Sequence, residues 1–442
     1  MSMINLSKYS ILFFKLLIVL SFFSSVEANT NEDVTLDDIL GLAYQASIEE
    51  PFVISSKAYV KSAEADLSAS KRQRLPVFTA SIKNALTIDR QISDRNALRK
   101  FEDEGLDLQV QMVQPIFTGL SIRADIDRSE SNLRGSIVES NKRLGQTIIE
   151  STSAYMMYVR DTKLRDDVNI ALKRSSELLE LVKKRYNAGL TDLSLFAQMR
   201  IKYSEMQLLA NTIESKFTNS RAVFLRFFSE ELLPTHNPTE VINYDFLDFL
   251  GSSQSYDLAL ARANLDAAEA ELLLSKGNRL PSIAVTVSGT LYDVDGSDEE
   301  EDEYDIKGGL QASWKFLDFG ASRKKVQASQ SKVRAAKYNI NYQTRIDEVE
   351  RLRLLSLISS LNKQLKEQYD VLEDINRQIM LMETQLTSSK FLGISLADLF
   401  YQKINVQSSI DTMEIDYVTG NLQLKLLSAN LVSFIAQKDI IN

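Results

Sequence analysis

Cysteine is absent from the 442 residues of this chain, and histidine and tryptophan occur once each. Without thiols the chain forms no disulfide, no thiolate metal site and no cysteine nucleophile, and no N-terminal cysteine can carry a lipid. The only histidine, His236, leaves no histidine cluster for zinc and no histidine-based triad. Asp and Glu pairs at helical spacing are overwhelmingly surface charges on long helices. We therefore expect no enzyme activity, no metal and no cofactor.

Net positive charge is also missing. The chain has 51 Lys and Arg against 60 Asp and Glu, which gives a formal net charge of −9. A nucleic acid would find no basic surface, so this class of partner is excluded. With 44% hydrophobic and 25% charged residues, the composition is that of a folded chain with a large core.

Long hydrophobic runs are absent beyond the N-terminus. There, Lys8 precedes an interrupted apolar run, Ile11–Phe23, and a small-residue site follows at Val26–Ala28. This order is typical of a secretory signal peptide at residues 1–28, cleaved before Asn29. An uncleaved anchor is the alternative, although a membrane helix needs about 20 apolar residues. The rest of the chain is expected beyond the inner membrane, where any membrane span must be made of strands.

Proline is scarce, and none lies in residues 119–233 or 282–442. Long helices are permitted in both intervals. Between Leu120 and Tyr186 the apolar residues follow heptad spacing, which favours a coiled-coil helix about 100 Å long. These apolar positions are 133, 137, 144, 148, 155 and 159, and Val326, Val333 and Ile340 are seven apart in the second interval, Ala321–Lys390.

The sequence contains two copies of one segment. Residues 63–66 and 74–76 (Ala-Glu-Ala-Asp, then Arg-Leu-Pro) recur 205 residues later at 268–271 and 279–281 with no gap. In each copy a short helical segment, two alternating segments and very long helical segments follow in the same order. We expect the copies to fold into one body.

The predicted divisions follow from this repeat. After the signal peptide, repeat 1 spans 29–233, a linker spans 234–253 and repeat 2 spans 254–442. The expected elements are a β-hairpin at about 76–117 and long helices at about 120–229, then a β-hairpin at about 281–317 and long helices at about 321–436.

The hairpins alternate apolar and polar residues. In the second, Ile283 and Val285 alternate with Ser282 and Thr286, and the return strand is expected to run through Phe316. Such runs of about 9 to 11 residues are typical of outer-membrane barrel strands, and an ordinary sheet with one solvated face is the alternative. Export, two equivalent hairpins and no other predicted sheet favour the barrel. Four strands cannot close one, so copies of the chain must share it.

Short motifs in a fixed order, each present in both halves, together resemble the TolC family of outer-membrane efflux and type I secretion proteins. They are Arg74–Pro76, Gln114–Gly119 and Tyr186–Gly189, then Arg279–Pro281, Leu317–Gly320 and Phe391–Gly393. The resemblance implies a mainly α fold with membrane β: two tandem repeats, each a β-hairpin plus long coiled-coil helices, forming a trimeric 12-stranded barrel continued by an α-helical tunnel. It also implies a homotrimer in outer-membrane lipid, with a periplasmic adaptor (membrane fusion) protein and an inner-membrane transporter as partners.

The resemblance further places the periplasmic tip and gate at the turns 186–195 and 391–400, where the adaptor would dock. The candidate residues are Tyr186, Gly189, Asp192, Leu195, Gly393, Asp398 and Leu399. In the family, acids beyond each turn ring the constriction. Here the two aspartates are not at equivalent positions, and leucines occupy the slots where the best-known members carry an acid. A glycine-capped turn without a special role is the alternative.

Two further features have open interpretations. The loop Asp293–Asp305 holds nine acids in thirteen residues and is expected to face outside the cell. Carboxylates at alternating positions suit calcium, but the spacing is not that of an EF-hand, so a solvated charge run is the alternative. Trp314 and Phe316 fit an interfacial aromatic girdle as well as the edge of a packed core.

The expected function is that of a passive channel-tunnel protomer. It would export substrates, either small molecules or secreted proteins, from the periplasm or through a tripartite pump, with its helical part in the periplasm. A soluble periplasmic coiled-coil scaffold or adaptor protein is the first alternative. An enzyme acting on polysaccharide or peptidoglycan through paired carboxylates is the second, but the sequence has no aromatic-lined segment to build its cleft.

Overall fold

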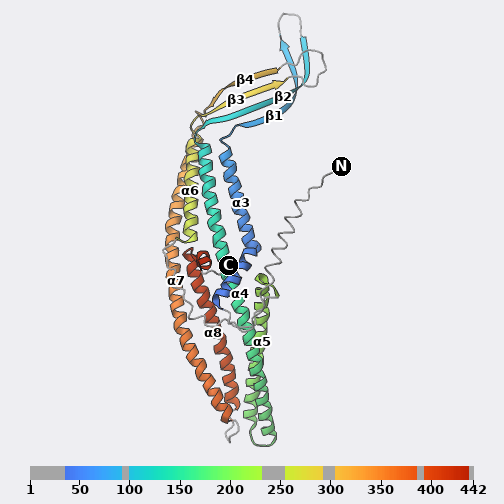
Figure 1. The fold of residues 1–442 in the computed structure, drawn as a ribbon, viewed down its shortest axis with the longest axis vertical. Coiled ribbons are helices and arrows are strands. Elements are labelled where there is room, and N and C mark those ends of the chain that lie inside the picture. The colour runs from blue at the N-terminus through green and yellow to red at the C-terminus, as the bar shows by residue number, and fades with distance from the viewer. Residues whose placement is uncertain (1–34, 92–98, 231–253, 292–303, 386–392, 438–442) are drawn as a thin grey trace.

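The fold is that of a computed structural model, which describes residues 35–91, 99–230, 254–291, 304–385 and 393–437. A long helical body carries a small sheet at one end (Figure 1). The expected signal peptide, the linker with His236, and the acidic loop as far as residue 303 lie outside the described residues.

The first repeat begins with two helices, where a single one was expected. Thr35 caps the first: its backbone N–H donates to the Asp38 carboxylate over 2.8 Å, and the Asp38 N–H donates to the Thr35 hydroxyl over 3.3 Å. Pro51 starts the second, since proline suits the first turn of a helix but not its interior. The elements are α2 (Leu36–Glu49), α3 (Pro51–Arg72), β1 (Val77–Gln91), β2 (Arg99–Thr118), α4 (Ser121–Asn187) and α5 (Leu193–Phe227).

The second repeat has the same order, with one described helix before its hairpin. Near the end of the chain a long helix stops at Leu427 and a short one begins at Leu431, and Ala429 between them has a φ of 53°. The elements are α6 (Tyr256–Gly277), β3 (Ser282–Leu291), β4 (Tyr304–Ser313), α7 (Ala321–Gln385), α8 (Gly393–Leu427) and α9 (Leu431–Gln437).

The return strand of the second hairpin is shorter than predicted. The prediction that it runs through Trp314 and Phe316 is wrong, because β4 ends at Ser313. The Trp314 indole N–H donates to the Arg279 carbonyl over 3.1 Å, which ties this segment to the chain before β3 instead of to a strand ladder. Phe316 is 79% exposed, so packing against a core does not explain it.

The two hairpins join in one antiparallel sheet of order β1-β2-β3-β4. The register carries the alternation across all four strands, so one face is apolar and the other polar, and a slip of one residue would mix the faces. An apolar row consists of Ile82, Leu108, Leu291 and Tyr304, and the neighbouring polar row of Ser81, Gln109, Thr290 and Asp305. The outer edges of β1 and β4 have no partner strand among the described residues.

The helices next to the sheet repeat the order of the strands. α3 packs against α4, α4 against α6 and α6 against α7, so the helix order α3-α4-α6-α7 follows β1-β2-β3-β4 (Figure 1). Farther from the sheet, α5 packs along α4 and α8 along α7, and α8 also contacts α4 and α5. The sheet and the four helices next to it therefore form a layer with two outer edges. We call these the α3 edge (α3 and β1) and the α7 edge (α7 and β4).

The hydrophobic core follows the heptad positions in the middle of α4. Leu144 and Ile148 pack with residues of α2, α8 and α9, while Tyr155 and Val159 pack with residues of α2 and α5, and all four are at most 8% exposed. Ile137, a predicted member of the same stripe, is 41% exposed. It lies in the part of α4 nearer the sheet, outside these core clusters.

Paired serines mark one helix contact in both repeats. Ser70 Oγ of α3 lies 2.8 Å from Ser129 Oγ of α4, and Ser275 Oγ of α6 lies 2.8 Å from Ser329 Oγ of α7. The first members of the pairs are 205 residues apart and the second members 200 apart. The duplication seen in the sequence therefore extends to how the helices pack.

Two glycines allow the start of α4 to pass the end of α6. A Cβ added at Gly277 would lie 1.9 Å from the Gly119 carbonyl oxygen, closer than any real contact. Gly119 also has φ +61°, in the left-handed region that glycine adopts without steric cost. This contact sets how closely the two repeats approach beneath the sheet.

Two carboxylates are partly buried between α8 and its neighbours α4 and α7. Asp411 accepts a hydrogen bond from Gln407 Nε2 over 2.6 Å at one oxygen, while its other oxygen is buried without a partner. Burial raises the pKa of Asp411 to about 6, against the opposing effect of Lys163 and Arg160 on α4. Burial also raises the pKa of Glu414, which accepts a hydrogen bond from the Tyr369 hydroxyl of α7.

Gly277→Ala should destabilise the junction between the repeats, because its methyl group would overlap the Gly119 carbonyl. Overpacking of this kind costs about 1–3 kcal/mol, measured as a lower midpoint of urea unfolding followed by helical circular dichroism. Gly289→Ala is the matched control, since a Cβ at Gly289 would meet nothing within 4 Å. Equal midpoints for the two variants would contradict the proposed role of this contact.

Asp411→Asn should stabilise the protein at pH 7 by about 1–2 kcal/mol, because it removes a charge that burial disfavours. The folded-state pKa lies above the unfolded value, so the folded chain binds more protons and stability falls as pH rises from about 4 to 6. The variant should lose this slope when the free energy of unfolding is measured across that range. Asp370→Asn, at an exposed acid of α7, is the control, and an unchanged slope in Asp411→Asn would refute the assignment.

Candidate functional site

The turn between α4 and α5 lies at the end of the molecule opposite the sheet (Figure 1). The Leu190 N–H donates to the Arg185 carbonyl over 2.9 Å and the Gly189 N–H to the Tyr186 carbonyl over 3.0 Å, which is a Schellman motif. Gly189 has φ +67° and nothing lies near a Cβ placed there. Its requirement for glycine is therefore conformational and not steric.

Asp192 has a structural task in this turn. It is the N-cap of α5, and its carboxylate accepts from the Leu195 N–H over 2.8 Å. Tyr186 stacks on Phe196 with ring centroids 5.4 Å apart and planes 9° from parallel. The carboxylate and the aromatic pair together hold the α4–α5 turn in one shape.

The start of α8 lies beside α5. Asp398 forms an ion pair with Lys202 of α5 over 2.7 Å and accepts from Gln402 Nε2 over 2.7 Å. Lys202 also pairs with Glu205 over 3.0 Å. Hydrogen bonds to Asp398 and then Glu205 raise the pKa of Lys202, so the ion pair persists at neutral pH. We call the contact between Lys202 and Asp398 the tip ion pair.

Apolar packing joins all four long helices at this end. The buried residues are Leu178 and Val182 of α4, Met199 of α5, and Leu396 and Ala397 of α8, with Ile379 of α7 packed against them. The other two predicted positions on α8 are also buried: Gly393 is its first residue, and Leu399 is 7% exposed. Leu195 is half-buried.

The structure thus gathers the predicted residues at one end but gives the acids specific partners. Asp192 caps a helix and Asp398 belongs to the tip ion pair. Lys202 and Phe196 were missed by sequence reasoning. The partner of Lys202 is far away in the sequence, and Lys202 is one of 51 basic residues, so no local pattern distinguishes it.

Two further features are absent from the described residues. No group of three or more Asp, Glu or His residues there is placed to hold a metal ion. No helix among the same residues combines the length and hydropathy needed to cross a membrane.

Part of the chain is similar to a known protein family. Residues 252–388 match the family described as Outer membrane efflux protein. No curated protein matches the chain.

Solved structures resemble the whole chain. The CmeC outer membrane channel of Campylobacter jejuni is 14% identical, with a TM-score of 0.76 over 94% of this chain and 93% of that one. The outer membrane protein VceC of Vibrio cholerae is also 14% identical, with a TM-score of 0.71 over 89% and 96%. The MtrE outer membrane channel of Neisseria gonorrhoeae is 13% identical, with a TM-score of 0.65 over 90% and 89%.

The TM-scores show a shared fold, and the matches extend over nearly the full length of both chains. The expected fold class, mainly helical with two β-hairpins, is confirmed. The resemblance to TolC-family channels is likewise confirmed: the chain has the fold of the outer-membrane efflux channels, and its residues 252–388 carry the signature of the outer membrane efflux protein family.

Proposed function

We propose that three copies of this chain form an outer-membrane channel that exports substrates from the periplasm. The sheets of the three copies would form a barrel in the membrane, and the helices a tunnel in the periplasm. A periplasmic adaptor protein and an inner-membrane transporter would complete the pump and supply the energy. The channel would catalyse no reaction, and its cargo would be small molecules or secreted proteins.

The sheet carries this proposal. Its apolar face is bare: Phe78 and Ile82 of β1 are each 66% exposed, and Ile306 and Leu310 of β4 are 72% and 77% exposed. Lipid would cover such a face, while the polar face would line a water-filled lumen. The outer edges of β1 and β4, which pair with no other described strand, could not remain open in lipid, where each unsatisfied backbone group costs several kcal/mol.

Closing the sheet requires further copies of the chain. One copy supplies four strands, and a transmembrane barrel needs at least eight. Three copies give twelve (three times four), the number that the resemblance to the TolC family implies. The 67 residues of α4, about 100 Å long at 1.5 Å per residue, suit a tunnel across much of the periplasm.

A soluble periplasmic scaffold accounts less well for the same surface. Such a protein would need its sheet covered by packing within the protomer, since large bare apolar patches are rare on soluble monomers. Among the described elements, the strands contact chiefly one another, and no helix packs extensively against the sheet.

We further propose that the helix ends far from the sheet form the gate. Tyr186, Gly189, Asp192 and Leu195 would shape the α4–α5 half, and Gly393, Asp398 and Leu399 the α8 half. Opening requires the α4–α5 pair and the α7–α8 pair to separate, and the tip ion pair opposes that movement. An adaptor that competes for Lys202 or Asp398 would therefore favour the open state.

The channel proposal predicts that the protein fractionates with outer membranes and requires detergent for extraction. It should migrate in gels with a heat-modifiable mobility, because a barrel resists unfolding until boiled. Purified protein should produce discrete conductance steps in planar bilayers. Full solubility of the mature chain without detergent would reject the channel in favour of the scaffold.

The gate proposal predicts that Asp398→Asn and Lys202→Gln each make opening more frequent. A partly exposed ion pair contributes about 1 kcal/mol, which corresponds to about a fivefold change in the open-to-closed ratio. Single-channel recordings measure that ratio, and the double variant should add little to either single variant because both remove one contact.

Lys216→Gln is the control for this experiment, since it removes an exposed charge from the same helix away from the tip. The gate assignment fails if both tip variants keep the parental open-to-closed ratio while the channel itself conducts.

A further inference from the structure

We propose that the junction between the strands and the helices binds the headgroups of anionic phospholipids in the periplasmic leaflet of the outer membrane. This inference rests on the proposed function, which puts the sheet in the membrane and the helices in the periplasm. We call the junction the collar (Figure 1). It consists of residues 71–76 and 276–281, where α3 and α6 end, and of residues 114–128 and 314–328, where α4 and α7 begin.

The collar is strongly basic in an acidic protein. It contains eleven Lys and Arg residues against three Asp residues, whereas the whole chain has a formal net charge of −9. All eleven basic residues are exposed. Positive charge that is gathered at one level of a negative molecule favours an anionic partner at that level.

Few of these charges are neutralised within the chain. Arg128 pairs with Asp125 over 2.9 Å. Arg123 lies 3.9 Å from Asp127, at the limit of an ion pair. The other nine basic residues of the collar form no ion pair with any described residue.

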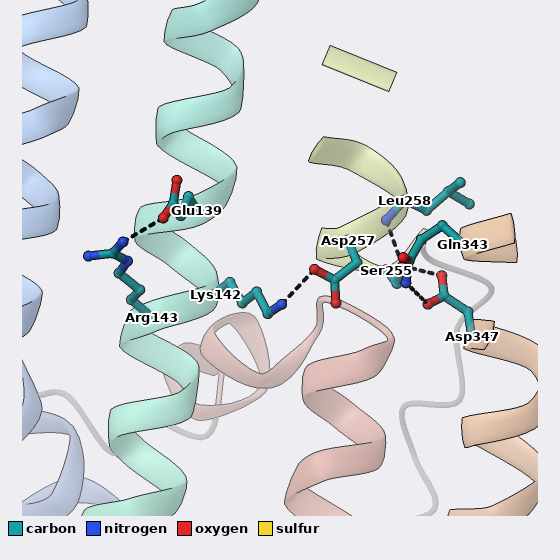
Figure 2. A network of polar contacts seen from close by, with 8 residues as sticks. All are labelled: Glu139, Lys142, Arg143, Ser255, Asp257, Leu258, Gln343 and Asp347. Atoms are coloured by element: carbon teal, nitrogen blue, oxygen red, sulfur yellow. Dashed lines mark hydrogen bonds and ion pairs between the residues drawn. The ribbon is translucent and has the colours of Figure 1, made fainter. Parts of the chain in front are cut away.

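Farther from the sheet, the charges on these helices are paired. Lys142 of α4 pairs with Asp257 of α6 over 2.5 Å (Figure 2). The next residue, Arg143, pairs with Glu139 of its own helix over 2.5 Å. Uncompensated positive charge is therefore a property of the collar and not of the helices in general, which favours a partner outside the chain.

A groove in the collar combines two of these charges with apolar side chains. It is lined by Arg74 and Arg123 and by residues that include Ile116 and Phe117. Phe117 pairs with Ile283, so it belongs to the apolar face of the sheet, and Ile116 is 61% exposed. Guanidinium groups bind phosphate oxygens through parallel N–H donors. A phosphate held by the two arginines would therefore have its acyl chains beside an apolar surface.

The second repeat carries the same arrangement. The arginine pair recurs there as Arg279 and Arg323, at the repeat offsets of 205 and 200. A further contact is shared: Gln114 Nε2 donates to the Arg74 carbonyl over 2.9 Å. The Trp314 indole donates to the Arg279 carbonyl over 3.1 Å. Each chain therefore offers two equivalent places for a headgroup.

The apolar residues around the second place are more exposed than those around the first. Phe316 is 79% exposed, Leu317 62% and Phe319 93%. Bare rings among basic residues suit the boundary between headgroups and acyl chains, where aromatic side chains gather. Lys and Arg suit the same boundary, because their long apolar stems lie along it while their charges reach the phosphates. A free phosphate ion would use the arginines but leave the rings in water, so a phospholipid fits both features.

Trp314 is the only tryptophan in the chain, so its fluorescence reports on the lipid beside the collar. The full chain is reconstituted in phosphatidylcholine that contains increasing amounts of brominated phosphatidylglycerol or brominated phosphatidylcholine. Bromine near the headgroup end of the acyl chains quenches tryptophan on contact. At low ionic strength, phosphatidylglycerol should bind about tenfold more tightly than phosphatidylcholine, because each basic residue beside anionic lipid contributes about fivefold. Added salt should weaken this preference.

Arg279→Gln combined with Arg323→Gln should lower the preference to about twofold and leave quenching by neutral lipid unchanged. Arg279→Lys combined with Arg323→Lys keeps both charges and should retain most of the preference. Lys363→Gln combined with Lys366→Gln is the matched control. It removes two exposed charges from α7, about 60 Å along the helix from Arg323, and should leave the preference at the parental value.

The outcomes separate this inference from the proposed function. Quenching of Trp314 that is equal for the two lipids, or a preference that the Gln variant keeps in full, overturns the lipid site and leaves the channel intact. Displacement of brominated phosphatidylglycerol by inorganic phosphate at constant ionic strength also overturns it, because the arginines would then bind a free ion. A protein that stays soluble, with Trp314 quenched by neither lipid, overturns the site and the proposed channel together.

Discussion

Among the described residues, the outer edges of β1 and β4 have no partner strand, and this is the constraint on which the rest of the structure depends. A strand edge can face water, but in lipid it must find a partner. The described sheet exposes an apolar face and two edges without a partner strand. Its apolar face suits lipid, but in lipid a single chain would leave both edges unpaired.

The helices continue the order of the strands away from the sheet. Their order matches the strand order, and close glycine and serine contacts hold α4 and α6, and then α6 and α7, at short distance. At the other end, one apolar cluster and the tip ion pair bring four helices together. Close packing of the helices near the sheet, and a far end where few polar contacts oppose separation, are the distribution of stability that the proposed gated tunnel would need.

Much of this was predictable from the sequence because it depends on local pattern. The proline-free interval predicted a helix from Leu120 to Tyr186, and α4 spans Ser121–Asn187. Alternation predicted both faces of the sheet. The features that were not predicted depend on distant partners. The Trp314 indole donates to the Arg279 carbonyl just beyond the early end of β4, and Asp398 forms an ion pair with Lys202 of α5. Helical periodicity shows which face of a helix is apolar, but not which distant side chain lies opposite.

The most direct test of the central claim is amide hydrogen exchange along the four strands in protein reconstituted in lipid. If copies of the chain close the sheet, the amides of β1 and β4 should exchange as slowly as those of β2 and β3, because every strand then has two partners. Fast exchange confined to the outer edges of β1 and β4, with slow exchange in β2 and β3, would show that the edges stay open and would contradict the account.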